Sequence, residues 1–156
     1  MSDRKAPAGK RQSGPVALYV KRLRPGARLP ERATPGATGY DVFACLDGET
    51  EVGQEPVRVP TGIAIEAPPG FDVQVRPRSG LSARGVMVTF GTIDSDYRGE
   101  VLVTMFVLPY RGPHTLRQGD RIAQLVVSRI EDIALEETET LSATERDAGG
   151  HGSTGR

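Results

Sequence analysis

Residues 101–108, VLVTMFVL, decide which kind of fold this sequence can adopt. The stretch is β-prone and apolar at both odd and even positions, and in an antiparallel sheet such a strand is covered on both faces. A chain of 156 residues has the size of one domain with one core. The second face of this strand therefore meets either the chain's own loops or another subunit, and the sequence leaves both alternatives open.

The segments on either side of this strand are short, β-prone and separated by Gly and Pro. Short strands at this spacing are typical of a β-sandwich or barrel, so we predict an all-β protein. No long run follows the i, i+3, i+4, i+7 pattern, and helix should be limited to a brief turn near Ser79–Arg84. The expected strands are Val16–Val20, Tyr40–Ala44, Gly62–Ile65, Phe71–Val75, Val86–Phe90, Val101–Leu108 and Ile122–Ile130.

The composition limits the partners and the compartment of the protein. Lys plus Arg and Asp plus Glu both number 20, so the formal net charge is zero and gives no general attraction to nucleic acid or to an anionic membrane. No apolar stretch is long enough to span a bilayer, and no apolar segment follows the basic N-terminus as a secretory signal requires. The single Cys45 excludes an internal disulfide framework. We expect a cytoplasmic protein without stable nucleic-acid or membrane binding.

Two polar segments flank the predicted β domain of residues 15–138. Residues 1–14, MSDRKAPAGKRQSG, are basic and rich in Gly, Pro and Ser, which predicts a disordered N-terminal lead. Residues 139–156 lose the apolar pattern and end in GGHGSTGR, which fits the phosphate-binding spacing G-x-G-x-x-G. In dinucleotide-binding folds a helix follows those glycines, and we expect none after them here. We therefore predict a flexible, Gly-rich C-terminal arm over residues 139–156.

The densest polar stretch is GTIDSDYRG, residues 91–99. If it is extended, the alternation of a strand places Asp94 and Asp96 on one face and Tyr97 on the other. Two neighbouring carboxylates form a candidate base, acid or cation site. A polar hairpin tip has the same composition, because Asp, Ser and Gly are ordinary turn residues.

Two further polar clusters interrupt the strands. RPRSGLS, residues 76–82, offers guanidinium groups, hydroxyls and a close-approach glycine to an oxyanion such as phosphate, or is a turn with solvated arginines. GDRIAQL, residues 119–125, places a polar Arg121 and Gln124 in an otherwise apolar strand.

Taken together, the clusters contain no nucleophile with its own base, so they fit a phosphate ester that water attacks while a divalent cation bridges the phosphates. His114 and His151 lack the spacing of a structural zinc site.

Five motifs stand in a fixed order along the chain: GATGYDVFA (36–44), PRSGLS (77–82), GTIDSDYRGEV (91–101), GDRIAQLV (119–126) and RDAGGHGSTG (146–155). In these motifs residues 16–155 resemble the homotrimeric dUTP diphosphatases, or dUTPases. The resemblance implies a jelly roll or distorted β-barrel and a homotrimer. It also implies three active sites at subunit interfaces, each of which draws on all three chains and is closed by the Gly-rich arm of a neighbour.

The resemblance further implies a reaction and roles for individual residues. The reaction is hydrolysis of dUTP to dUMP and pyrophosphate, which keeps uracil out of DNA and supplies dUMP for thymidylate synthesis. Asp94 would activate the water that attacks the α-phosphorus, and Tyr97 would pack on the deoxyribose and exclude a 2′-hydroxyl. Mg²⁺ would be chelated by phosphate oxygens and water, with Asp41 reaching it through water. The remaining substrate-binding residues would be Arg78, Ser79, Gly80 and Gln124 on the phosphates, Gly91 at the uracil, and Arg146, His151, Gly152, Ser153 and Thr154 in the closing arm.

Two positions depart from the family pattern. His151 stands where a Phe is usual, and the turn of residues 88–91 is short and lacks an Asn that many bacterial members carry, so uracil should be read mostly by main chain. Two alternatives remain: a dCTP deaminase-type enzyme of the same fold, and a non-catalytic nucleotide-binding jelly roll. The retained hairpin with Asp94 argues against both.

Overall fold

The computed structural model describes residues 16–144 and 148, and in this part the chain forms β-strands and a single four-residue helix. The predicted all-β class is confirmed, and the brief helical turn lies where it was expected. In chain order the elements are β1 (Tyr19–Arg22), β2 (Tyr40–Phe43), β3 (Thr50–Val52), β4 (Val57–Glu66), β5 (Phe71–Arg76), α1 (Ser79–Ser82), β6 (Val86–Val88), β7 (Gly91–Ile93), β8 (Glu100–Val107), β9 (His114–Leu116) and β10 (Arg121–Arg129).

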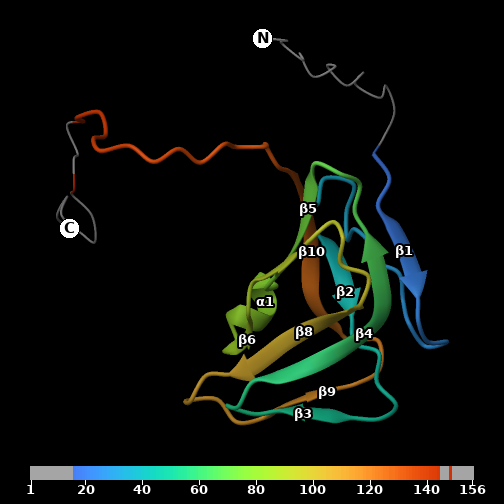
Figure 1. The fold of residues 1–156 in the computed structure, drawn as a ribbon. Helices are drawn as coiled ribbons and strands as arrows, with labels where there is room; N and C mark the ends of the chain where they lie inside the picture. The colour runs from blue at the N-terminus through green and yellow to red at the C-terminus, as the bar shows by residue number, and fades with distance from the viewer. Residues whose placement is uncertain (1–15, 145–147, 149–156) are drawn as a thin grey trace.

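Two four-stranded antiparallel sheets enclose the core (Figure 1). One sheet has the order β1-β4-β8-β6 and the other β2-β10-β5-β7, while β3 and β9 pair at one end of the molecule. Crossovers between non-consecutive strands in both sheets are those of a jelly roll. Fully buried side chains from both sheets meet between them, among them Val59, Val103, Val73 and Leu125.

The strand β8 lies in the middle of the first sheet, between β4 and β6. Its residues Val101, Val103, Met105 and Val107 are at most 2% exposed and face the core. On the opposite face Leu102 remains 40% exposed. Within residues 16–144, the second apolar face of this strand therefore stays partly uncovered at Leu102.

The strand β4 runs farther than its sequence suggests, because it continues through Pro60 and Gly62. Its register with β8 shifts between Pro60 and Ala64, and a bulge of this kind is where a sheet tolerates Pro. Gly62 has φ +69°, and a Cβ there would lie 2.8 Å from both Ala27 Cβ and Cys45 Sγ. Only glycine fits this bend, which sharpens the curve of β4 over the core.

All seven expected segments contain a strand, although β1 begins later than predicted and β6 ends earlier. The strands β3, β7 and β9 were not predicted. Each has three residues, which is too short for a visible alternation of apolar and polar positions.

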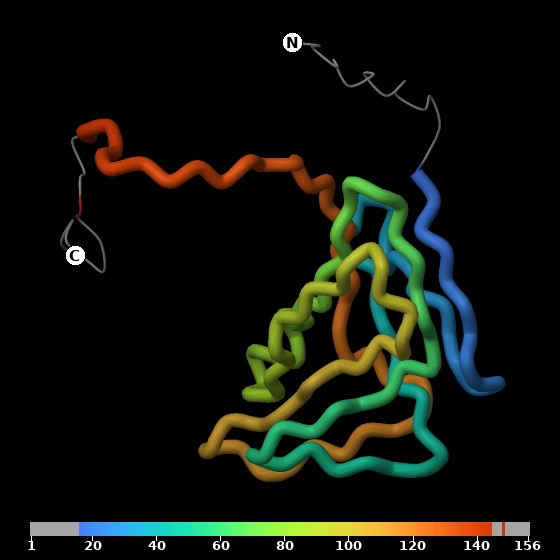
Figure 2. The backbone as a smooth tube through the Cα atoms, in the orientation of Figure 1, coloured from blue at the N-terminus to red at the C-terminus, as the bar shows by residue number. Residues whose placement is uncertain are grey.

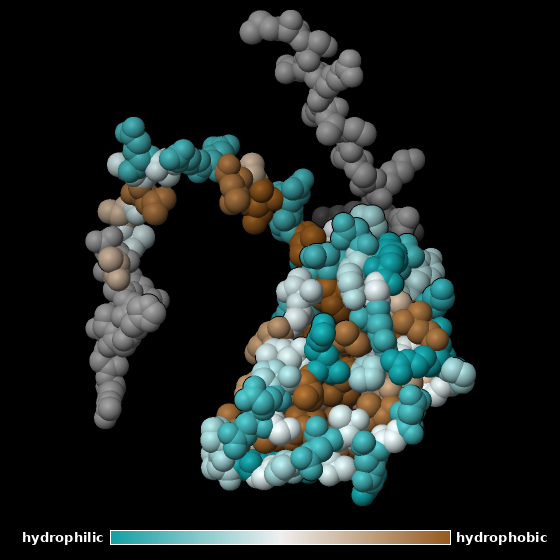
Figure 3. Space-filling model, turned by 60° about the horizontal axis from the view of Figure 1, so that its bottom comes forward, coloured by the Kyte–Doolittle hydropathy of each residue, from teal (hydrophilic) through white to brown (hydrophobic). Residues whose placement is uncertain are grey.

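Beyond β10, residues 130–144 leave the body of the molecule as an extended segment (Figure 2). Apolar side chains stand in the open along this segment, as the brown atoms of Figure 3 show: Ile133 is 73% exposed, Leu135 97% and Leu141 88%. The single helix in the described residues is not long and apolar enough to cross a membrane.

Candidate active site

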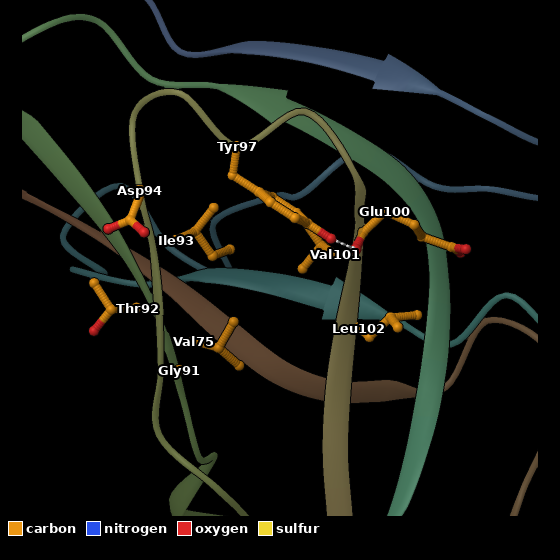
Figure 4. Close-up of a pocket in the computed structure, with 9 residues that line it drawn as sticks. All are labelled: Val75, Gly91, Thr92, Ile93, Asp94, Tyr97, Glu100, Val101 and Leu102. Atoms are coloured by element: carbon orange, nitrogen blue, oxygen red, sulfur yellow. Dashed lines mark hydrogen bonds between the residues drawn. The ribbon is translucent and has the colours of Figure 1, made fainter.

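The hairpin that joins β7 to β8 holds a cleft of about 220 Å³ (Figure 4). Its floor is apolar and its rim carries the polar residues that the sequence singled out. The lining residues are Val75, Gly91, Thr92, Ile93, Asp94, Tyr97, Glu100, Val101 and Leu102. Gly91, Asp94 and Tyr97, three of the predicted site residues, therefore share one cleft.

A turn, and not a strand, carries the two aspartates. The strand β7 ends at Ile93, and the Tyr97 amide donates to the carbonyl oxygen of Asp94 at 3.1 Å. The strand alternation considered for Asp94 and Asp96 is therefore wrong, because the chain turns before the second carboxylate. Both aspartates are exposed, and Figure 4 shows the Asp94 carboxylate at the end of β7.

The Tyr97 ring reaches across the hairpin toward β8 (Figure 4). Its hydroxyl donates to the carbonyl oxygen of Glu100 at 3.0 Å, and a side chain at Gly99 would collide with that hydroxyl. The ring is thus held in one position by the hairpin itself, with 43% of the residue open to the cleft and to solvent.

Glu100 anchors the base of the hairpin, a role that the sequence did not indicate. Its Oε1 accepts from Arg24 Nη2 at 2.8 Å and from the Gly62 amide at 2.7 Å. The bend of β4 at Gly62 turns this amide toward Glu100. Next to it, the Thr61 hydroxyl donates to the carbonyl oxygen of Val101 at 2.6 Å. The hairpin is therefore tied to the bulge in β4 at two successive residues.

A second group of predicted site residues surrounds the start of α1. Arg78 precedes this helix, and its Nε donates to Asp41 Oδ1 at 3.0 Å while its Nη1 donates to the carbonyl oxygen of Arg121 at 3.1 Å. Arg121 Nη1 approaches the other Asp41 oxygen at 3.2 Å. The Asp41 side chain is only 12% exposed, so one nearly buried carboxylate holds two guanidinium groups.

Gln124 fixes the loop that leads to Arg78. In β10 it lies opposite Asp41 of β2 and Arg76 of β5, and its Nε2 donates to the carbonyl oxygen of Pro77 at 2.9 Å. Ser79 and Gly80 begin α1 and are exposed, while Leu81 is buried beneath them. Sequence reasoning identified Arg78 and Gln124 but missed that Arg121 completes the cluster.

The two groups do not meet within one chain. None of the residues Arg78, Ser79 and Gln124 lines the hairpin cleft. The predicted arm residues Arg146, His151, Gly152, Ser153 and Thr154 lie outside the described residues. Within the described part of the chain, no three His, Cys, Asp or Glu side chains are grouped as a metal site. The arrangement supplies a carboxylate and an aromatic ring on one cleft and a fixed guanidinium with hydroxyl and amide groups on another surface.

Comparisons with known proteins agree on one family. The family model described as dUTPase matches residues 26–155. A deoxyuridine 5′-triphosphate nucleotidohydrolase from Nocardia farcinica is 46% identical over 141 residues, which cover 88% of this chain and 85% of the relative. The protein of the same name from a Hydrogenobaculum species is 46% identical over 144 residues, with 90% and 99% covered.

Solved structures show the same architecture. The dUTPase of Staphylococcus bacteriophage 80alpha, solved as a mutant with dUpNHpp, superposes with a TM-score of 0.78 at 27% identity and covers 90% of this chain and 99% of its own. A dUTPase from phage phi11 of S. aureus, described with a structural Mg(II) ion, has a TM-score of 0.71 at 24% identity with 80% and 97% covered. The jelly-roll prediction is thereby confirmed.

Proposed function

The chain belongs to the dUTPase family, and from this membership we propose that it hydrolyses dUTP to dUMP and pyrophosphate by attack of water on the α-phosphorus. The family match and the 46% identical nucleotidohydrolases support the reaction. The observation that carries the assignment to this chain's own residues is the cleft that Asp94 and Tyr97 line together with Gly91, Ile93 and Val101.

Asp94 is the residue that would orient and activate the attacking water. Its carboxylate is exposed at the rim of the cleft, so a water molecule can reach it. The backbone around it is braced by the turn to Tyr97 and by Glu100, which supports a positioned base. The Tyr97 ring would pack on the deoxyribose, since its hydroxyl is already engaged and its position leaves little freedom to admit a 2′-hydroxyl.

The phosphate chain would be held by Arg78, Ser79, Gly80 and Gln124. Asp41 orients the Arg78 guanidinium, and a guanidinium that is fixed before binding needs no rearrangement to neutralise developing charge. The arm residues Arg146, His151, Gly152, Ser153 and Thr154 would close over the same phosphates.

The described residues fit a magnesium ion that is held mainly by substrate. No cluster of three ligating side chains is present among them, and both Asp41 oxygens already accept from arginines. A Mg²⁺ ion would therefore be coordinated by phosphate oxygens and water, with Asp41 at most in contact through water. When bound, the ion would neutralise phosphate charge, while Arg78 and Gln124 keep the chain of phosphates in place.

A homotrimer would bring the two groups of residues together. Three observations support it: the hairpin cleft and the Arg78 cluster do not share lining residues, one face of β8 is partly uncovered, and residues 130–144 expose apolar side chains away from the body. The arm of residues 139–156 would then cross to a neighbouring subunit. The disordered lead of residues 1–14, the cytoplasmic location and the lack of nucleic-acid binding stay predictions.

The proposed function is tested by incubating the full chain with dUTP and Mg²⁺ and by measuring released pyrophosphate and dUMP. Formation of both products in equal amounts is expected. Ammonia released from dCTP would assign the chain to the deaminase class of this fold, and nucleotide binding without turnover of either substrate would make it a non-catalytic jelly roll.

A further inference from the structure

A second cleft, of about 250 Å³, lies beside α1 and has three arginines in its lining. Leu81 of α1 and the residues Arg78 and Arg84 on either side of this helix form one wall. The strand β9, which begins at His114, and the strand β10, which begins at Arg121, form the other. Asp120 is the one acidic residue in this lining.

The positive charge in this cleft is not balanced by the described part of the chain. Arg78 and Arg121 share the single carboxylate of Asp41. Asp120, whose Oδ2 accepts from the Arg117 amide at 2.8 Å, adds a second negative charge, which leaves the three arginines in excess. Arg84 is exposed and forms no ion pair within residues 16–144. Three guanidinium groups gathered on a concave surface attract an anion, and guanidinium matches the geometry of phosphate oxygens.

His114 adds a hydrogen-bond donor to the same cleft. Arg111 Nη2 lies 3.2 Å from His114 Nδ1, and since guanidinium has donors only, Nδ1 accepts and the ring proton is on Nε2. Partial burial lowers the pKa of His114, and the neighbouring charges of Arg111 and Arg84 lower it further, while Asp120 opposes them. Arg111 Nε is buried and has no hydrogen-bond partner among the described residues. The ring therefore favours its neutral form and lies beside more positive than negative charge.

The cleft differs from the proposed substrate phosphate site. Arg78 and Arg84 lie just outside the two ends of α1, and Leu81 of this helix lines the cleft with them. Ser79, Gly80 and Gln124, the other phosphate-binding candidates, do not line the cleft. Arg78 stands at the border between the two surfaces.

We propose that the cleft of Arg78, Arg84, His114 and Arg121 is a second phosphate-binding site, which takes free orthophosphate or the pyrophosphate that the reaction releases. The binding itself does not depend on catalysis. Its link to product does rest on the proposed function. Arg84 and His114 are the residues that belong to this site alone.

The test measures the pKa of each of the two histidines of the full chain, by following their ring NMR signals as the pH is changed. The His114→Gln variant shows which signals belong to His114. Orthophosphate and pyrophosphate are added in separate experiments, without nucleotide or Mg²⁺, up to about 10 mM, which reaches sites with millimolar Kd. Each anion that binds should raise the pKa of His114 by about one unit, because an opposite charge favours the protonated ring. Chloride at equal ionic strength is the control.

Two variants separate this site from the substrate site. Arg84→Gln should abolish the response of His114 and leave the KM for dUTP unchanged, whereas Ser79→Ala should keep the response. A response to pyrophosphate alone assigns the site to product, and a response to orthophosphate alone assigns it to free phosphate. The proposal is overturned if neither anion shifts His114 more than chloride does, if Arg84→Gln responds like the wild type, or if Ser79→Ala loses the response. If the protein does not hydrolyse dUTP, the His114 titration still decides the anion site.

Discussion

Replacing Asp41 with Asn should loosen the Arg78 guanidinium without changing the shape of the site. Asp41 accepts from Arg78 Nε at 3.0 Å and from Arg121 Nη1 at 3.2 Å. An amide of the same size keeps one acceptor but turns an N–H group toward the other guanidinium. The neutral side chain also leaves the charge of both arginines uncompensated beside a nearly buried position.

The size of the effect follows from how exposed each partner is. The Arg78 side chain is only 26% exposed, so solvent screens its bond to Asp41 little. Hydrogen bonds of this kind, between charged groups, contribute about 1.5–3 kcal/mol to stability. The Arg121 side chain is 51% exposed and resembles a surface pair, which contributes about 0–1 kcal/mol. We expect a loss of about 2–3 kcal/mol in the free energy of unfolding. For a chain of this size that corresponds to a Tm lower by about 4–12 °C.

Thermal unfolding at fixed protein concentration and steady-state kinetics with dUTP would measure both consequences. The KM should rise by about tenfold, the equivalent of 1.4 kcal/mol of lost phosphate binding. Glu31→Gln is the matched control: it removes an exposed ion pair with Arg28 from the neighbouring segment and should change stability by less than about 0.5 kcal/mol.

The outcome also separates two roles for Asp41. If the carboxylate acted mainly on the water shell of Mg²⁺, excess Mg²⁺ would restore the KM. If it acts by holding Arg78, excess Mg²⁺ has no effect, and the defects of Asp41→Asn and Arg78→Gln are not additive. An unchanged Tm and KM, or fully additive defects, would refute the coupling of Asp41 to Arg78.

Three further results are expected. Asp94→Asn should reduce kcat by about 10²-fold or more and Asp96→Asn much less, as steady-state rates would measure, because only Asp94 lines the cleft. Tyr97→Ala should lower the ratio of kcat/KM for dUTP to kcat/KM for UTP. An unchanged ratio would show that the Tyr97 ring does not select the sugar. Gly62→Ala should destabilise the fold by about 2–4 kcal/mol in denaturant unfolding, from a left-handed backbone and a collision with the core, whereas Gly36→Ala, with open space around it, should be neutral.

The fold could be predicted from the sequence wherever a strand was long enough to show its pattern. Val101–Leu108 and Ile122–Ile130 are dense runs of β-prone residues, and the structure has β8 and β10 there. The strand β4 was recognised only from Gly62 onward, because Pro60 and Gly62 are local signals for a break. Two features override those signals: the pairing of β4 with β8, and the close approach of Gly62 to Ala27 and Cys45, which leaves no room for a side chain. Neither feature is visible in a single sequence.

The candidate site was also only partly predictable from the sequence. The motifs identified Asp94, Tyr97, Arg78 and Gln124, and the structure places Asp94 and Tyr97 in one cleft. Glu100 was missed because its partner, the Gly62 amide, lies 38 residues away along the chain. The bond from Arg121 to Asp41 spans 80 residues and carries no spacing signal either. Residues that act by holding a motif in place are found only once the strands are paired.

The contacts that brace the site form within one chain, whereas the residues that would touch the substrate would come together only between chains. Within one chain, Glu100 holds the hairpin and Asp41 holds Arg78, so each surface is braced by hydrogen bonds of its own. The residues that would meet dUTP are largely exposed on both surfaces. An exposed base and an exposed hydroxyl are weak catalysts while water surrounds them, because bulk water screens their charge. In the proposed trimer, bringing the two braced surfaces of different copies together and covering them with the arm would exclude that water. The chain thus has to preorganise only the local geometry, and trimer formation and closure of the arm would supply the dry environment in which that geometry becomes effective.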